Sequence, residues 1–118
     1  MSNQSKRFTI AIIHRNGYKR LKGTLDSLIK AKNNLDEIFI VDNASTDDSI
    51  KKICSDVTYD GIKIIKNSCN TGYGYASNQA MKQGLGQYFL ICNNDLILPA
   101  DCLDGFEETF QEYPNSGM

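Results

Sequence analysis

The sequence predicts an α/β fold in which a mostly parallel sheet lies between layers of helices. Short apolar runs alternate along the chain with segments whose apolar residues recur at helical spacing. Polar residues directly follow two of these runs, as the strings Asp42 to Asp48 and Asn93 to Asp95. Because open parallel sheets bind ligands beyond the carboxyl ends of their strands, we expect a binding crevice at these strings.

The length indicates one domain over residues 1–118, and the pattern of charged and apolar residues indicates a cytoplasmic protein. The 118 residues suffice for one modest core, and 13 basic against 14 acidic side chains give a formal net charge of −1. Without an overall positive field, a nucleic-acid partner is not expected. No apolar stretch reaches the length of a membrane span, and residues 1–7 are polar where a signal peptide would be apolar.

The four cysteines, at positions 54, 69, 92 and 102, are irregularly spaced. They form no Cys-x-x-Cys pair and the chain has one histidine, which argues against a zinc site. Cys54 and Cys92 fall at apolar positions of a helix pattern and a strand pattern. We therefore expect these two to be buried free thiols.

Four strand and helix pairs follow one another along the chain. The expected strands, each short and rich in β-branched or aromatic residues, are residues 8–14, 37–42, 62–66 and 88–92. A helix is expected after each strand because apolar or small residues recur there every three or four positions. The residues that carry these patterns are Leu21, Leu25, Leu28 and Ile29; Ile50, Ile53 and Cys54; residues 76–83; and Leu103, Phe106 and Phe110.

Residue types also predict where three of these helices begin or end. Ser45 or Thr46 is expected to cap the second helix, with Asp47–Asp48 in its first turn near the positive end of the helix dipole. Gly84 is expected as the C′ glycine that ends the third helix. Pro99 suits the first turn of the last helix, where its missing N–H is not needed.

The connections predict the order of the strands. Right-handed crossovers place helices on both faces, and two crossovers in one direction followed by a return give the order 3-2-1-4. The order reverses between strands 1 and 4, so residues 14–17 join those at 42 and 93–95 around the crevice. His14 either lines this pocket or is a histidine whose ring nitrogens are satisfied at a strand end.

Four motifs occur in order between residues 9 and 95. They are the run Thr9 to Asn16 before a Leu-rich helix, the string Val41 to Asp47 that fits V-D-D/N-x-S-x-D, the Asn-x-Gly segment Asn70 to Asn78, and a D-x-D-like element that ends Gly86 to Asp95. Together they resemble the GT-A glycosyltransferases of family 2, which usually have Thr or Ser where His14 stands. Asn93 replaces the first Asp of D-x-D, and this N-x-D variant resembles the rhamnosyltransferase-like branch.

The resemblance implies a three-layer, Rossmann-like GT-A nucleotide-binding half that binds a nucleotide diphosphate sugar. Asp42 would accept a hydrogen bond from the ring N–H of uracil or thymine. Asp95 would hold Mg²⁺ or Mn²⁺, which prefer oxygen ligands, and Asn93 would bind a ribose hydroxyl. The predicted nucleotide-binding residues are His14, Asn16, Asp42, Asn43, Asn70, Gly72, Asn78 and Asn93.

The resemblance also implies what lies outside this truncated half. Family 2 enzymes continue with another strand, an acceptor-binding part and a carboxylate base, so the base is expected beyond Met118. The complete enzyme would transfer sugar with inversion to a saccharide or lipid-linked acceptor in cell-envelope polysaccharide synthesis, in the cytoplasm or peripherally at the inner face of the membrane. Residues 1–118 alone should not transfer sugar efficiently. Their unpaired sheet edge favours self-association.

Two other functions fit parts of the sequence. Gly-Tyr-Gly at residues 72–74 resembles a dinucleotide-binding turn of an oxidoreductase, although Ser77 stands where the third glycine would be. The chain could also be a catalytically silent binding or interaction module, because a fold need not keep its activity. In that case Asp42, Asp47 and Asp95 would serve only as turn and cap residues.

Overall fold

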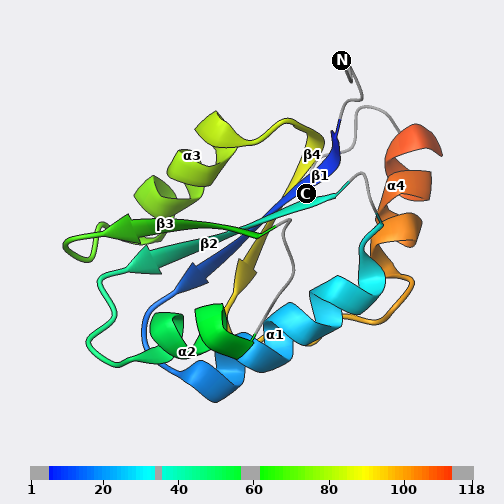
Figure 1. The fold of residues 1–118 in the computed structure, drawn as a ribbon. Coiled ribbons are helices and arrows are strands. Elements are labelled where there is room, and N and C mark those ends of the chain that lie inside the picture. The colour runs from blue at the N-terminus through cyan, green and yellow to red at the C-terminus, as the bar shows by residue number, and fades with distance from the viewer. Residues whose placement is uncertain (1–5, 34–35, 57–61, 113–118) are drawn as a thin grey trace, which may run out of the picture.

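The structure, a computed structural model, describes residues 6–33, 36–56 and 62–112. Strands and helices alternate in these ranges as predicted (Figure 1). They are β1 (Lys6–His14), α1 (Tyr18–Ala31), β2 (Glu37–Asn43), α2 (Ser49–Asp56), β3 (Ile62–Asn67), α3 (Tyr73–Gln83), β4 (Gly86–Asn93) and α4 (Cys102–Glu112). No helix in the described ranges combines the length and the apolar composition that a bilayer crossing needs.

The strands form one parallel sheet in the order β3-β2-β1-β4, which confirms the predicted order. Its register aligns the strand ends, because His14 pairs with Asp42 and Asp42 pairs with Lys66. On the other side of β1, Ile13 pairs with Asn93. The polar residues that follow the strands therefore meet at one end of the sheet, at the arrow tips in Figure 1.

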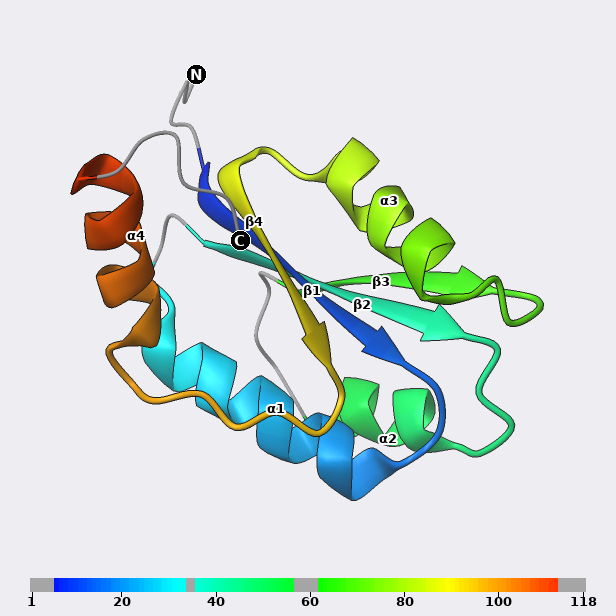
Figure 2. The same ribbon diagram turned by 180° about the vertical axis from the view of Figure 1, so that it is seen from behind.

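Helices cover both faces of the sheet. α1 and α2 lie on one face with α4 near the end of α1, and α3 lies on the other face (Figures 1 and 2). Side chains of β1 alternate accordingly: Ile10 and Ile12 belong to the larger core cluster with the α1 leucines, and Ala11 packs in a smaller cluster with Ala76 and Ala80 of α3. Every residue of β2 is buried, because neighbouring strands and helices surround it.

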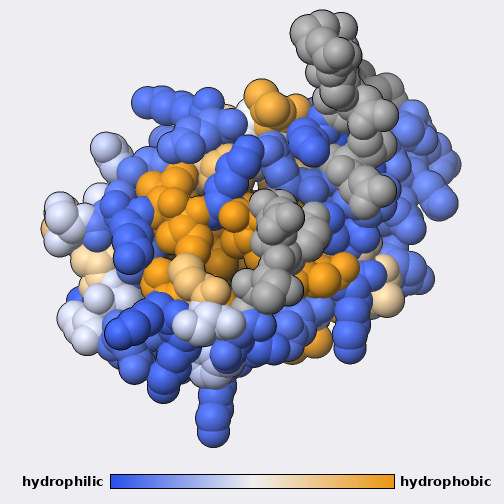
Figure 3. Space-filling model, in the orientation of Figure 1, coloured by the Kyte–Doolittle hydropathy of each residue, from blue (hydrophilic) through white to orange (hydrophobic). Residues whose placement is uncertain are grey.

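The edge strand β3 is less well covered. Ile62, Ile64 and Ile65 are half-buried, and Lys63 and Lys66 are exposed. Figure 3 shows apolar surface gathered between α3 and α2, where this strand runs, with hydrophilic side chains around it. Within the described residues, β3 and β4 are the two outer strands, so each has one side without a neighbouring strand.

Arg7 closes the amino end of the sheet. Its Nε and Nη2 groups donate to Oδ1 and Oδ2 of Asp36, at 2.9 and 2.6 Å. Its Nη1 group donates to Asp104 at 2.6 Å and to Glu107 at 3.3 Å, both on α4. Asp36 also accepts a hydrogen bond from Phe8 N at 3.1 Å. These ion pairs tie α4 to the starts of β1 and β2.

The second helix begins later than predicted. α2 starts at Ser49, so Ser45 and Thr46 do not cap it and its first turn holds no acidic residue. Asp47 instead accepts hydrogen bonds from the backbone N of Ser49 at 3.1 Å and from its hydroxyl at 2.5 Å. Several residues in the string 42–48 have side chains that could cap a helix. Residues 45–47 instead hydrogen-bond with Asn16 and Gly17, and the helix begins after them.

Four further predictions differ in detail from the structure. Cys54 is exposed, because the buried side of α2 is formed by Ser49, Ile50 and Ile53, whereas Cys92 is buried as expected. Gly84 is extended (φ −75°) and not a left-handed C′ residue. A Cβ at Gly84 would lie 2.4 Å from Thr9 Cγ2, so close approach to β1 explains the glycine. The last helix begins three residues after the proline predicted in its first turn, and α3 begins at residue 73 rather than 76.

Candidate functional site

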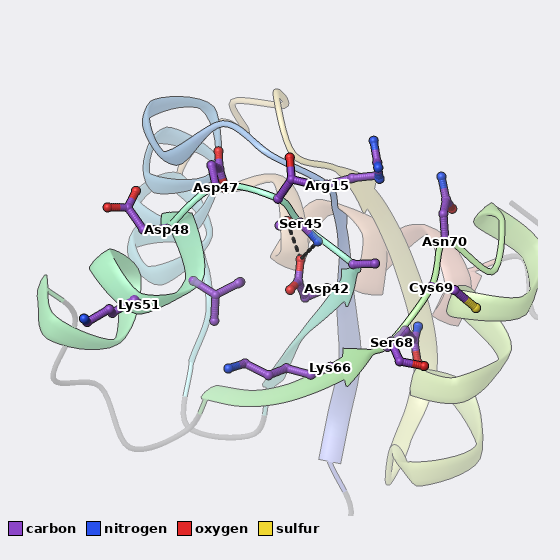
Figure 4. A pocket seen from close by; sticks show the side chains of 14 residues that line it. Arg15, Asp42, Ser45, Asp47, Asp48, Lys51, Lys66, Ser68, Cys69 and Asn70 are labelled. Carbon is purple, nitrogen blue, oxygen red and sulfur yellow. Dashed lines mark hydrogen bonds between the residues drawn. The ribbon is translucent and has the colours of Figure 1, made fainter.

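Two adjoining cavities lie at the carboxyl ends of the strands. The larger, of about 640 Å³, is lined by residues 44–48 and 66–70 together with Arg15 and Asp42 (Figure 4). The smaller, of about 270 Å³, lies toward β4 and is lined by residues that include His14, Asn43, Tyr73 and Asn94. Arg15 and Asn70 line both cavities, so the two adjoin in the crevice region at this end of the sheet. It lies where the strand ends predict a binding crevice.

Asp42 stands at the end of β2 and is 7% exposed. Its Oδ1 atom accepts hydrogen bonds from Ser45 N at 3.3 Å and Ser45 Oγ at 2.5 Å, which are the dashed lines in Figure 4. Ala44 has a left-handed backbone (φ 63°) that turns the chain so that Ser45 faces back toward Asp42. No described residue hydrogen-bonds to Oδ2, so one carboxylate oxygen of a cavity-lining residue remains an acceptor for a ligand.

Asn43 lines the smaller cavity and hydrogen-bonds to the loop that follows β3. Asn43 is 4% exposed. Its Oδ1 atom accepts hydrogen bonds from Asn67 Nδ2 at 3.0 Å and from Thr71 Oγ1 at 2.8 Å. Its Nδ2 donates to the carbonyl of Gly72 at 3.3 Å. Asn43 therefore holds the loop between β3 and α3 through both its amide oxygen and its amide nitrogen.

Asn16 joins the first loop to the second. Its Oδ1 accepts hydrogen bonds from Thr46 N at 2.7 Å and Asp47 N at 3.2 Å, and its own backbone N donates to Ser45 Oγ at 2.9 Å. The residue has a left-handed backbone (φ 61°), which asparagine tolerates better than most residues. Gly17 N then donates to Asp47 Oδ2 at 2.8 Å. These contacts hold residues 45–47 beside the larger cavity.

His14 is fully buried, and both of its ring nitrogens have partners. Nε2 lies 2.7 Å from Ser49 Oγ, and Nδ1 lies 3.0 Å from Asn94 Nδ2. Burial lowers the pKa of His14 from its ordinary value of 6.5, against the opposing effect of Asp42 and Asp47. Both ring nitrogens are thus satisfied, as one sequence-based alternative expects, and the residue also lines the smaller cavity, as the other expects. A direct contact between His14 and a nucleotide remains a prediction.

The Asn93 to Asp95 turn lies at the end of β4, next to β1. Asn93 and Asp95 are exposed, whereas Asn94 is half-buried. Asn94 Nδ2 donates to the carbonyl of Asn16 at 3.1 Å, in addition to its contact with His14. The middle residue of the motif thus points into the protein, and the two outer residues remain accessible.

Charged side chains line the larger cavity from several loops. Figure 4 shows Lys66 on the strand next to Asp42, and Arg15 and Lys51 on other sides of the space. Hydrogen bonds from the Ser49 side chain and from the Gly17 backbone lower the pKa of Asp47 to about 2, so this carboxylate is ionised at neutral pH. The cavity therefore offers both cationic donors and anionic acceptors.

The remaining predicted site residues differ in their positions. Asn70 Oδ1 accepts a hydrogen bond from Gly72 N at 3.1 Å and the residue lines both cavities. Gly72 is the N-cap of α3 and has a positive φ of 83°, which explains the glycine. Asn78 is exposed on α3 and lines neither cavity.

The described side chains do not form a metal site by themselves. Within residues 6–33, 36–56 and 62–112, no three His, Cys, Asp or Glu side chains come together as a metal site. Asp95 offers one carboxylate and Asn93 an amide oxygen. Since Mg²⁺ and Mn²⁺ commonly take one or two carboxylates plus substrate phosphates, these donors fit an ion that binds together with a diphosphate. They do not fit an ion held by these residues alone.

Several residues of the site were missed by the sequence-based prediction. Lys66 lines the cavity because it pairs in register with Asp42. The polar residues at the end of the third strand could have indicated this position from the sequence. Ser49 and Asn94 contact His14 across 35 and 80 residues of sequence. No spacing rule predicts such contacts, since they depend on how three loops meet.

Comparisons with known proteins agree on the family and the fold. The sequence profile described as Glycosyl transferase family 2 matches residues 9–118. A comparison with curated proteins gave no match. Among solved structures, S. aureus TarS 1–349 in complex with UDP-GlcNAc is 23% identical, with a TM-score of 0.82 over 92% of this chain and 32% of that chain. The mannosyltransferase PcManGT from Pyrobaculum calidifontis, in complex with GDP-Man and Mn²⁺, is 20% identical, with a TM-score of 0.72 over 84% of this chain and 30% of that chain.

The structural similarity concerns the fold, because both identities are below 25%. It confirms the predicted α/β class and the GT-A arrangement of a 3-2-1-4 sheet between helices. The chain spans about a third of the length of these solved structures. The family profile, by contrast, is a match of sequence, and it covers residues 9–118 of this chain. The chain therefore belongs to glycosyl transferase family 2.

Proposed function

We propose that this chain is the donor-binding part of a glycosyltransferase that uses a uridine or thymidine diphosphate sugar. The observation that carries the proposal is the free Oδ2 acceptor of Asp42 on the larger cavity, in a chain of this family. The solved complexes of TarS with UDP-GlcNAc and with UDP support it, since both superpose on 92% of this chain. The proposed domain comprises residues 1–118 of a longer enzyme.

The base selectivity follows from the chemistry of a carboxylate. An ionised carboxylate accepts hydrogen bonds and cannot donate, so Asp42 selects a base edge that presents a ring N–H. Uracil and thymine present one such N–H between two carbonyl groups. Lys66 and Arg15 line the same cavity and can donate to carbonyl or phosphate oxygens. Guanine also has a ring N–H, and PcManGT was solved with GDP-Man, so guanine nucleotides are the comparison to make.

The diphosphate and the sugar are proposed to lie toward β4. Asn93 would bind a ribose hydroxyl and Asp95 would ligate Mg²⁺ or Mn²⁺ together with the diphosphate oxygens. A bound ion would neutralise charge on the diphosphate as it leaves. Asn16, Asn43, Asn70 and Gly72 would hold the loops of the site in place, while His14 and Asn78 remain predicted contacts.

Other parts of the proposal concern the complete enzyme. Transfer with inversion needs a base that removes the proton of the acceptor hydroxyl, and we place this base beyond Met118. The N-x-D motif favours the rhamnosyltransferase-like branch and an acceptor that is a saccharide or a lipid-linked glycan of the cell envelope. We place the enzyme in the cytoplasm or at the inner face of the membrane. The half-buried apolar side chains of β3 and the open side of β4 could support self-association.

Calorimetric titration with UDP, dTDP, GDP and NAD, each with and without Mn²⁺, tests the proposal. UDP or dTDP should bind more tightly with Mn²⁺ than without it. At 100 times the dissociation constant, binding should stabilise the fold by about 2.7 kcal/mol, or roughly ten degrees in Tm. Stronger binding of NAD would instead support the dinucleotide alternative. Donor binding by a longer enzyme that transfers no sugar would support the silent-module alternative.

A further inference from the structure

The only histidine of the chain lies in the middle of a hydrogen-bond series that joins three loops of the crevice. Asn94 Nδ2 lies 3.0 Å from His14 Nδ1 and 3.1 Å from the carbonyl oxygen of Asn16. On the other side of the ring, Nε2 lies 2.7 Å from Ser49 Oγ, which lies 2.5 Å from Asp47 Oδ1. The series runs from the β4–α4 turn, through the end of β1, to the loop before α2.

The chemistry of the groups fixes the direction of each hydrogen bond. The carbonyl of Asn16 can only accept, so the NH₂ end of the Asn94 amide must face it. The second hydrogen of this NH₂ group then points to His14 Nδ1, which must be an unprotonated acceptor. A neutral imidazole in this state carries its proton on Nε2 and donates to Ser49, whose hydroxyl donates to the carboxylate of Asp47. Every donor has an acceptor only when His14 is the neutral Nε2–H tautomer.

The two ends of this series belong to the two halves of the proposed donor site. Asn94 lies between Asn93 and Asp95, which we assign to the ribose and the metal. Asp47 lies in the loop that lines the larger cavity, and its backbone N is also bound by Asn16. Because the linking ring is 0% exposed and hydrogen-bonded at both nitrogens, the two halves are connected through a buried group whose position is fixed.

We propose that His14 and Asn94 are positioning residues that hold the Asn93 to Asp95 turn against the loop of the base cavity. The inference rests on the proposed function, because it assigns this turn to the diphosphate and its metal ion. Asn94 acts through His14 and Asn16 and does not touch the ligand. An aspartate at position 94 could donate to neither acceptor, which gives a physical reason for an amide in the middle of the motif.

Nitrogen-15 NMR of the single histidine tests the hydrogen-bond series without any ligand. At pH 7 the ring should be neutral, with the proton on Nε2 and an unprotonated Nδ1. Asn94→Ala should shift the Nδ1 resonance because it removes the donor to that atom, and Gln111→Ala, which removes an exposed amide from α4, should leave it unchanged. A protonated ring or an Nδ1–H tautomer would overturn the proposal, whatever the chain binds.

Titration with UDP, with and without Mn²⁺, tests the consequence for binding. Residues that support metal ligands typically change metal affinity 10- to 100-fold, so Asn94→Ala should lose about tenfold or more of the Mn²⁺-dependent UDP affinity. It should keep the metal-free affinity for UMP, and Gln111→Ala should keep both. Unchanged Mn²⁺-dependent affinity in Asn94→Ala overturns the positioning role and leaves the proposed function standing. A wild-type chain that binds no nucleotide overturns the proposed function itself.

Two substitutions of His14 separate positioning from a general loss of folding. His14→Gln keeps one donor and one acceptor in the place of the ring, whereas His14→Leu has neither. Thermal unfolding shows first that both variants are folded. His14→Gln should then retain more of the Mn²⁺-dependent UDP affinity than His14→Leu. Equal losses in the two folded variants would contradict a role that depends on these hydrogen bonds.

Discussion

The two ends of the parallel sheet bury polar side chains in different ways. At the amino end, the side chains of Arg7 and Asp36 are 4% and 0% exposed and form a two-point ion pair, to which Asp104 adds a second carboxylate. At the carboxyl end, Asp42 is 7% exposed and forms no ion pair with any described residue. The described residues donate to only one of its two carboxylate oxygens, and both of these hydrogen bonds come from Ser45.

This difference separates a structural charge from one that is available to a ligand. Burying a charge without a partner is costly, so the amino end satisfies its charges within the protein. At the carboxyl end, a carboxylate oxygen remains without a protein partner beside a cavity of about 640 Å³. We therefore expect substitutions at the amino end to lower stability, and those at the carboxyl end to lower ligand affinity.

The largest expected effect is on stability, from Asp36→Ala. This substitution leaves the buried Arg7 guanidinium without its main partner, and breaking a buried pair costs about 3 to 5 kcal/mol. Chemical denaturation measures the change in the free energy of unfolding. The matched control is Asp26→Ala, which breaks the exposed pair with Lys22 and should cost below about 1 kcal/mol. If the two variants lost similar amounts of unfolding free energy, the buried ion pair at the amino end would not have the structural role assigned to it.

The next largest effect is expected on UDP binding, which Asp42→Ala should weaken. It removes the acceptor for the ring N–H of the base, and an unpaired buried donor costs about 1 to 3 kcal/mol, so UDP affinity should fall with and without Mn²⁺. Calorimetric titration measures the loss, with Asp26→Ala again as the control. If Asp42→Ala instead destabilised the fold as much as Asp36→Ala and left UDP affinity unchanged, Asp42 would be a structural charge like those at the amino end.

Asp95→Ala should remove only the metal-dependent part of UDP binding. Asp95 is exposed in the turn after β4, so its loss should change the free energy of unfolding by no more than about 0.5 kcal/mol. Titrations in Mn²⁺ and in EDTA separate the two contributions. An equal loss of affinity in EDTA would show that Asp95 does not act as a metal ligand.

The smallest expected effect is a pH dependence of stability that comes from His14. Burial lowers the pKa of His14 in the folded state, while Asp42 and Asp47 raise it and Arg20 lowers it further. The unfolded chain therefore takes up the proton first, so stability should fall as pH drops below about 6.5, by at most about 1.4 kcal/mol per pH unit. The lowered pKa of Asp47, at about 2, affects a separate and more acidic range.

Urea denaturation between pH 7 and pH 5 measures this dependence. The His14→Gln variant provides the reference, because it lacks the titrating ring. The difference between the two proteins should grow as the pH is lowered. A difference that does not vary with pH would mean that the buried ring keeps its ordinary pKa.

The sequence by itself determined the class of fold and predicted where the crevice would lie. The period of the apolar residues predicts four strands and four helices, and the handedness of the connections predicts the order 3-2-1-4, which the structure confirms. Buried positions such as Leu21, Leu25 and Leu28 follow from that period alone. The polar strings after β2 and β4 were sufficient to predict a crevice, because parallel strands bring their carboxyl ends together.

Tertiary structure decided the roles of individual residues in the loops. Ser45 or Thr46 was expected to cap α2, but both instead hydrogen-bond with Asn16. The series from Asn94 through His14 joins residues 80 positions apart. Hydrophobic periods repeat locally along the chain and so can be read from sequence, whereas hydrogen bonds between loops depend on the packed sheet that brings their ends together.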